Sequence, residues 1–334
     1  MVSISTMEPV NGRPPLPLPA VIREEKQWLF SEAELLRTPS ILDGMGADEE
    51  KTLRRKGVNF ILQVGMMLKL PQTTLSTAAI FMQRFLMRYS IVPKKGYKPM
   101  HHYQIAATAL FLATKVEENG RKIKELIVAC VRVALKDPNK IVDEQEKDYW
   151  KWRDTILYGE DTLLELLCFD LSVESPYKTM YEMLRYYHLE HNKRVRNASW
   201  AFLSDSALTQ LCLLHSSRTI AAASLFAGTR MAGIEIPPTD GKPWWETQQV
   251  ELRNVRRACN LMVDIYGTTT PKDGEVSIYD GLRTPEDSAE DGMLIDEHAP
   301  SQQVNGNGMD IDKEATQESR VPERDGSEEG ELEE

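Results

Sequence analysis

The charged end of one predicted helix contains the side chains best placed to bind a partner. Residues 112–126 read LATKVEENGRKIKEL, in which Lys115, Glu117 and Glu118 end an Ala-rich, nearly uncharged helix and Asn-Gly at 119–120 is a stop signal. Carboxylates at a helix C-terminus are unfavourable, because the helix macrodipole is negative there. The acidic pair can therefore mark a contact with a partner, or it can be the solvated end of a core helix.

The sequence contains no compact motif for catalysis or nucleotide binding, which favours a binding protein over an enzyme. It has no P-loop, no GxGxxG after a strand, no HExxH, no GxSxG and no HRD or DFG. His188 and His191 are three residues apart, but no third ligand lies near them in sequence, so we interpret them as polar residues at a helix end. We expect no metal and no cofactor, although absent motifs do not exclude a site assembled from scattered residues.

The cysteines and the apolar segments indicate a soluble, intracellular chain. No CxxC pair occurs, so neither disulfides nor a zinc site is expected. We expect all four cysteines to be small, reduced residues of the core: Cys130, Cys168, Cys212 and Cys259. No run of 18 uncharged apolar residues is present, and the N-terminal residues lack the apolar region of a secretory signal.

The negative charge of the chain is concentrated towards its C-terminal end. The net charge is −11 over 334 residues, but residues 271–334 alone carry 20 acidic and 5 basic side chains. Residues 1–270 therefore carry 35 basic and 31 acidic side chains, a net charge of +4. This is not the strong basic footprint of a nucleic-acid-binding protein. We expect no direct nucleic-acid partner and no membrane partner.

Helical periodicity runs through the middle of the chain, without alternating strand patterns or hairpin signals. The expected helices are residues 49–70, 74–89, 102–118, 123–135, 144–169, 176–188, 194–214, 217–233 and 251–266. Residues 105–111 (IAATALF) and 220–226 (IAAASLF) match at nearly every position, which indicates two related all-α units. Both copies keep the pattern of a buried central helix. The acidic pair that follows the first copy is missing from the second.

These patterns divide the chain into four parts. Residues 26–172 and 173–267 are predicted to be two tandem five-helix units. Residues 1–25 are expected to be a disordered Pro-rich leader and residues 268–334 a disordered acidic tail, because neither buries enough apolar surface to offset the entropy of ordering. Within the tail, Thr284 precedes a proline and is a candidate for proline-directed phosphorylation.

Five segments resemble those of the cyclin family. Residues 110–118 (LFLATKVEE) are similar to the LAxKxEE signature of the cyclin box. Further segments resemble transcription cyclins of the T and K types: 27–40 (QWLFSEAELLRTPS), 79–90 (AIFMQRFLMRYS), 166–177 (LLCFDLSVESPY) and 236–246 (IPPTDGKPWWE). The resemblance covers roughly residues 27–266 and implies two tandem cyclin boxes.

The resemblance implies that the first box binds a kinase and that the second mainly supports the fold. Lys115 and Glu118 match family residues that hydrogen-bond the kinase near its αC helix, and Glu160 matches a further acidic contact. Phe169 and Leu171 match apolar contacts that follow the fifth helix. Simpler interpretations remain for two of them, since Glu160 can be a surface carboxylate and Phe169 a core residue.

The resemblance also implies a regulatory subunit rather than an enzyme. Such a subunit forms a heterodimer with a cyclin-dependent kinase, as in P-TEFb, and the nuclear kinase phosphorylates the C-terminal repeats of RNA polymerase II during elongation. The polymerase elongation machinery is a further expected partner. One alternative is a general transcription factor of the TFIIB type, which would need a zinc ribbon and a strongly basic core. Another is a cyclin-fold scaffold without a kinase partner.

Overall fold

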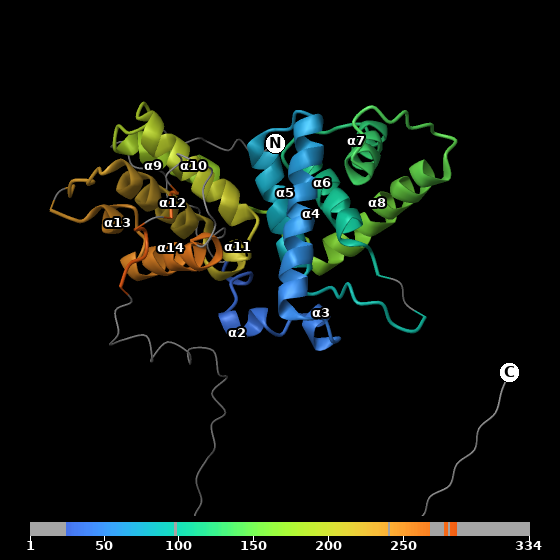
Figure 1. The fold of residues 1–334 in the computed structure, drawn as a ribbon, viewed down its shortest axis with the longest axis horizontal. Coiled ribbons are helices and arrows are strands. Elements are labelled where there is room, and N and C mark those ends of the chain that lie inside the picture. The colour runs from blue at the N-terminus through green and yellow to red at the C-terminus, as the bar shows by residue number, and fades with distance from the viewer. Residues whose placement is uncertain (1–24, 97–98, 240, 268–276, 280, 286–334) are drawn as a thin grey trace, which may run out of the picture. The chain divides into compact units, whose positions relative to one another are not determined.

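The computed structural model describes residues 25–96, 99–239, 241–267, 277–279 and 281–285, and the expected all-α fold is confirmed there (Figure 1). In chain order the helices are α2 (Glu32–Leu35), α3 (Pro39–Leu42), α4 (Ala47–Met67), α5 (Gln72–Phe85), α6 (His102–Val116), α7 (Ile123–Leu135), α8 (Lys147–Leu166), α9 (Pro176–Tyr186), α10 (Lys193–Ala207), α11 (Leu211–Leu214), α12 (Ser217–Ala232), α13 (Trp244–Thr247) and α14 (Leu252–Tyr266). An isolated antiparallel bridge joins Thr239 and Lys242. No described helix is long and apolar enough to cross a membrane.

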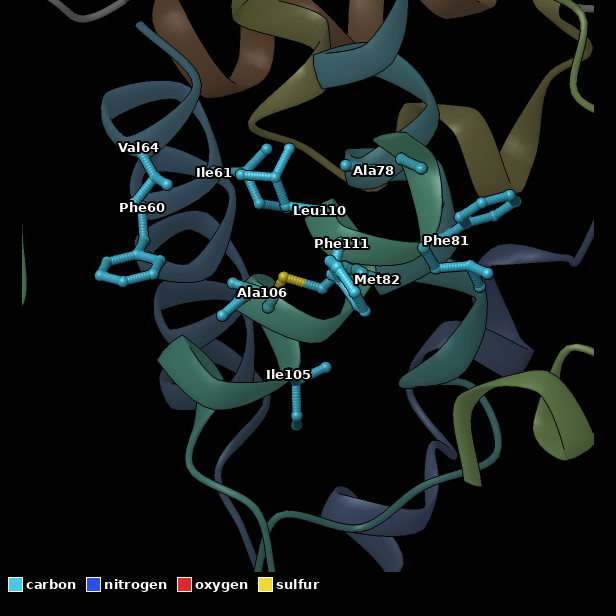
Figure 2. Close-up of a cluster of buried hydrophobic side chains, with 14 of the residues drawn as sticks. Phe60, Ile61, Val64, Ala78, Phe81, Met82, Ile105, Ala106, Leu110 and Phe111 are labelled. Atoms are coloured by element: carbon cyan, nitrogen blue, oxygen red, sulfur yellow. The ribbon is translucent and has the colours of Figure 1, made fainter. Parts of the chain in front are cut away.

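Helix α6 is the centre of the first unit and packs against α4, α5 and α8. Its alanines at 106, 107, 109 and 113 are fully buried, and their small side chains allow the close packing of the surrounding helices. Figure 2 shows the side chains of α4, α5 and α6 that meet in this core: Phe60, Ile61, Val64, Ala78, Phe81, Met82, Ile105, Ala106, Leu110 and Phe111. At Gly57 of α4, an added Cβ would lie 2.0 Å from Met82 Cε.

Helix α12 has the same central role in the second unit, where it packs against α9, α10 and α14. At Gly228 of α12, an added Cβ would lie 2.3 Å from Ser199 Oγ of α10, so only glycine allows this approach. The elements α11 and α13 are each a single turn. The second unit therefore has four long helices, and its fourth helix is reduced to α13.

The expected helix over residues 194–214 is wrong in its last part, because the chain breaks it into α10 and α11. In the break, the Thr209 carbonyl oxygen accepts a hydrogen bond from Gln83 Nε2 of α5 at 3.1 Å. The Gln83 Oε1 atom in turn accepts from Arg54 Nη1 of α4 at 2.9 Å. The break therefore serves a contact with the first unit, which the sequence of the second unit alone does not encode.

The expectation that all of residues 268–334 are disordered is wrong for residues 277–279 and 281–285, which we call the strap. Tyr279 and Leu282 of the strap are 6% and 1% exposed and belong to the core of the second unit. Their burial supplies the free energy that ordering this short segment requires. The remaining parts of 268–334, and the expected leader apart from residue 25, lie outside the described residues.

The expectation that every cysteine lies in the core holds for Cys130 and Cys259 but is wrong for Cys168, which is exposed, while Cys212 is half-buried. Cys168 and Phe169 follow the end of α8 with φ of +53° and +55°. This left-handed turn leaves the helical path, so side chains that the helical period would place against the core are redirected to the surface.

Two buried histidines predict that stability falls in acid. Burial lowers the pKa of His102 and of His215 to about 4. In the unfolded chain these histidines have a pKa near 6.5. Their contribution to the free energy of unfolding is therefore fully present above that pH and is lost as the pH falls towards 4. The loss is at most about 3 kcal/mol per histidine. Urea unfolding at pH 7.5 and pH 5 measures this loss.

The variant His215→Gln is the matched control, because its glutamine does not titrate. It should lose less stability between pH 7.5 and pH 5 than the wild type does. The buried carboxyl groups of Glu174 and Asp205, whose pKa values burial raises, are present in both proteins and cancel in this comparison. Equal losses in the two proteins would contradict the prediction.

Candidate functional site

The structure brings together Lys115 and Glu160, which are 45 residues apart in the sequence. Lys115 lies in the last turn of α6, and its Nζ atom donates to both carboxylate oxygens of Glu160 on α8, at 2.6 and 2.7 Å. The Lys115 side chain is 47% exposed and that of Glu160 is 14% exposed. The pair is therefore formed within the chain, and about half of the Lys115 side chain stays exposed to solvent.

The Lys115 side chain also packs over an aromatic ring. Its Nζ atom lies 4.2 Å from the ring centroid of Phe111, one turn earlier on α6. The spacing of four residues places both side chains on one face of the helix, so the sequence already contained the signal for this contact. The second unit repeats this arrangement, with Arg230 lying 5.9 Å from the ring of Phe226.

The two acids that follow Lys115 have different surroundings. Glu117 caps α6, and its Oε1 atom accepts a hydrogen bond from Thr77 Oγ1 of α5 at 2.7 Å. Glu118 has a left-handed backbone, with φ of +55°, and its side chain is exposed. Asn119 secures the turn by donating to Thr74 Oγ1 at 3.0 Å. Glu117 therefore has a structural contact, and Glu118 is the acid that faces outward.

The turn after α8 exposes the aromatic residue that the sequence comparison singled out. Phe169 is 68% exposed, so the alternative that it is a core residue is wrong. Leu171 is partly buried and packs against the core of the first unit. A large exposed aromatic ring beside a supported aliphatic side chain is a typical contact for a protein partner.

The chain on either side of Phe169 is held by the first unit. Asp170 Oδ2 accepts hydrogen bonds from Trp28 Nε1 and Gln27 Nε2, both at 2.7 Å. Trp28 is fully buried, and the guanidinium groups of Arg84 and Arg88 lie 5.1 and 4.6 Å from its ring centroid. These contacts anchor the turn that carries Phe169.

We define the candidate face as Lys115, Glu118, Glu160, Phe169 and Leu171. Lys115 and Glu118 come from the end of α6 and Glu160 from α8, while Phe169 and Leu171 lie in the separate segment that follows α8. Tyr158 is 76% exposed on α8, but a step of two residues turns it about 200° away from Glu160 around the helix axis. It therefore lies on a different side of α8.

Removal of the Lys115–Glu160 pair is expected to leave the fold nearly as stable as before. A partly exposed ion pair contributes about 1 kcal/mol or less, because water screens the charges and two flexible side chains must be ordered. Urea unfolding of Lys115→Ala should therefore resemble that of Arg230→Ala, the matched change in the second unit. A loss above about 3 kcal/mol would contradict this estimate and would assign the pair a structural role.

The described residues offer no alternative site with the chemistry of a metal centre. No three His, Cys, Asp or Glu side chains among them could hold a metal ion together. His191 is almost fully exposed and lies 3.7 Å from Glu190, and His188 lies in the turn after α9. The candidate face thus consists of charges at the ends of two helices and one exposed aromatic ring.

Comparison with known proteins places this arrangement in context. The family model "Cyclin, N-terminal domain" matches residues 26–172. The chain is 42% identical to cyclin pch1 of Schizosaccharomyces pombe over 256 residues, which are 76% of this chain and 73% of that protein. It is 31% identical to cyclin-T1-5 of Arabidopsis thaliana, over 84% of this chain and 48% of that protein, and 31% identical to human cyclin-K, over 72% and 40%. The chain thus spans about half the length, or less, of these T and K relatives.

A solved structure has the same fold. A chain of the crystal structure of the yeast RNA Pol II CTD kinase CTDK-1 complex matches with a TM-score of 0.57, and the match covers 81% of each chain. The sequences are 16% identical, so this likeness concerns the arrangement of the helices alone.

Proposed function

Because this chain belongs to the cyclin family, we propose that it is the regulatory subunit of a cyclin-dependent kinase, which it binds through the candidate face. The carrying observation is an asymmetry between two equivalent helices. Lys115, bonded to Glu160, and the exposed Glu118 lie at the C-terminal end of α6. The equivalent positions at the end of α12 are Arg230 and Gly233, and Ala232 stands in place of Glu117. Both helices fill the centre of their unit, so a partner of the first unit alone accounts for the difference.

The proposed mechanism follows from how protein kinases are switched on. A kinase is active when its β3 lysine pairs with the glutamate of its αC helix and its activation loop is ordered. A bound subunit shifts this equilibrium only by its higher affinity for the active conformation. The chain therefore supplies no catalytic group. Lys115 and Glu118 supply charged hydrogen-bonding groups for the αC region, and Phe169 supplies an apolar contact.

We also propose the substrate and the compartment. The kinase phosphorylates the C-terminal repeats of RNA polymerase II, and the pair acts in the nucleus to promote elongation. The support is the similarity to cyclin pch1 and to cyclins of the T and K types, the branch that the sequence motifs resemble. The net charge of +4 on residues 1–270 does not favour a TFIIB-like DNA-binding role.

Affinity purification of the full chain tests the proposal. A cyclin-dependent kinase should co-purify with it from cells that express it, and the eluate should phosphorylate a polymerase-repeat peptide. The control is Lys115→Ala/Glu118→Ala/Glu160→Ala, verified as folded by its circular dichroism, which should recover neither the kinase nor the activity. A wild-type chain that brings down no kinase would contradict the proposal and favour the scaffold alternative.

A further inference from the structure

The strap is built into the surface of the second unit. Tyr279 stacks on Tyr266 of α14, with ring centroids 5.4 Å apart and an interplanar angle of 14°. Its hydroxyl group donates to Asp205 Oδ2 of α10 at 2.6 Å. Together with the buried Leu282, these contacts bind the strap to two helices of the second unit.

The end of the strap is held by a reciprocal set of hydrogen bonds. The Thr284 N–H and hydroxyl groups donate to Asn260 Oδ1 of α14 at 3.0 and 3.4 Å, and Asn260 Nδ2 donates back to the Thr284 carbonyl oxygen at 3.1 Å. Thr284 is 6% exposed and Asn260 is 4% exposed. The neighbouring Arg283 is bonded to Asp264, one turn further along α14. Pro285 follows Thr284, so this buried hydroxyl belongs to a Thr-Pro dipeptide.

We propose that Thr284 is a phosphorylation site and that its modification releases the strap from the second unit. A proline-directed serine/threonine kinase transfers the γ-phosphoryl group of ATP to Thr284 Oγ1. The bond from the γ-phosphorus to the β,γ-bridging oxygen breaks, the Oγ1–P bond forms, the hydroxyl proton passes to the base of the kinase, and ADP leaves. The threonine thereby gains a charge of about −1.5 to −2.

The position of Thr284 in the bound strap does not accommodate a phosphate. The hydroxyl group of Thr284 is a donor to Asn260 Oδ1, whereas phosphate oxygens are acceptors and would face another acceptor. A buried charge is unfavourable unless it is paired, and Arg283, the neighbouring cation, is already bonded to Asp264. Asp264 adds like-charge repulsion. A retained phosphate would need a different cation, such as Arg256, one turn before Asn260 on α14.

The burial of Thr284 also sets the order of events. A kinase needs an extended, accessible acceptor, so it acts on the strap while the strap is transiently open, and the phosphate then prevents closing. Opening uncovers the rings of Tyr266 and Phe202, against which Tyr279 lies. This inference rests on the proposed function only for the source of the kinase, because the bound partner would be a kinase held close to its own regulatory subunit.

The rate of phosphorylation tests whether the bound strap controls access of a kinase to Thr284. The full-length chain is incubated with ATP and an added, purified proline-directed kinase, and modification is followed by mass spectrometry. Leu282→Ala and Asn260→Ala, which weaken the strap, should raise the rate at Thr284 at least about 10-fold. Thr270, which also precedes a proline, is the internal reference and should keep its rate. Equal rates at Thr284 in the wild type and both variants, or no modification in any of them, would overturn the proposal.

Hydrogen–deuterium exchange then tests the release itself. The phosphorylated chain should lose protection in residues 277–285 while α4–α6 keep theirs, and Thr284→Val, treated identically, should not change. Unchanged or increased protection of the strap, as expected if Arg256 binds the phosphate, would overturn the proposal. Because the kinase is added, a chain that recruits no kinase of its own fails the proposed function and can still pass this test.

Discussion

Lys115→Glu should weaken binding of the partner kinase at least about 30-fold, since removing one member of a desolvated charge pair from an interface costs about 2–5 kcal/mol. The change leaves two carboxylates facing each other where Lys115 Nζ now lies 2.6 and 2.7 Å from the oxygens of Glu160. It also places a negative charge where a positive one is offered to the kinase. The dissociation constant of the purified complex, measured by isothermal titration calorimetry, checks this result.

A charge swap separates a binding role from a structural one. In Lys115→Glu/Glu160→Lys the ion pair can form again within the chain, but each charge occupies the other's position. Binding should therefore stay weak, while Arg230→Glu in the second unit should bind like the wild type. Full recovery of binding in the swapped protein would show that the pair only supports the fold.

Glu50→Ala should lower the free energy of unfolding by about 3–5 kcal/mol, because it leaves a buried guanidinium group without its counter-charge. Glu50 and Arg54 lie one turn apart on α4, each 1% exposed, with Arg54 Nη2 donating to Glu50 Oε1 at 3.0 Å. Desolvation already lowers the pKa of Arg54, and the charge of Glu50 opposes that effect. Urea unfolding monitored by circular dichroism measures the loss.

The double variant Glu50→Leu/Arg54→Met is the control for this interpretation. It removes both charges and keeps the volume apolar, so it should regain most of the stability lost in Glu50→Ala. It should not restore the hydrogen bond to Gln83, which joins α4 and α5 to Thr209 of the second unit. If the double variant is as unstable as Glu50→Ala, the unpaired charge is not the cause of the loss.

Much of the fold was predictable because its central helices have a composition that only a buried helix explains. The repeated IAATALF and IAAASLF patterns correctly placed α6 and α12 at the centres of two related units. Local signals failed where contacts with residues distant in the sequence determine the structure. The break before α11 depends on Gln83 of the first unit, and the strap depends on two apolar side chains within an acid-rich segment.

The sequence singled out the residues of the candidate face, but it did not predict how they are arranged. The sequence motifs singled out Lys115 and Glu160, but only the structure shows that they bind each other. Nor could the sequence separate Glu117 from Glu118, because the hydrogen bond from Thr77 comes from another helix. The exposure of Phe169 follows from a turn with two consecutive left-handed residues. Neither residue is a glycine, so the sequence gives no signal for this turn.

Amide hydrogen exchange of the chain with and without its kinase tests most directly whether the first unit alone provides the binding face. The account predicts that kinase binding protects residues 115–120 and 167–172, at the ends of α6 and α8. The equivalent end of α12, residues 230–235, should exchange at the same rate in both states. Protection at α12 without protection at α6 and α8 would contradict the account.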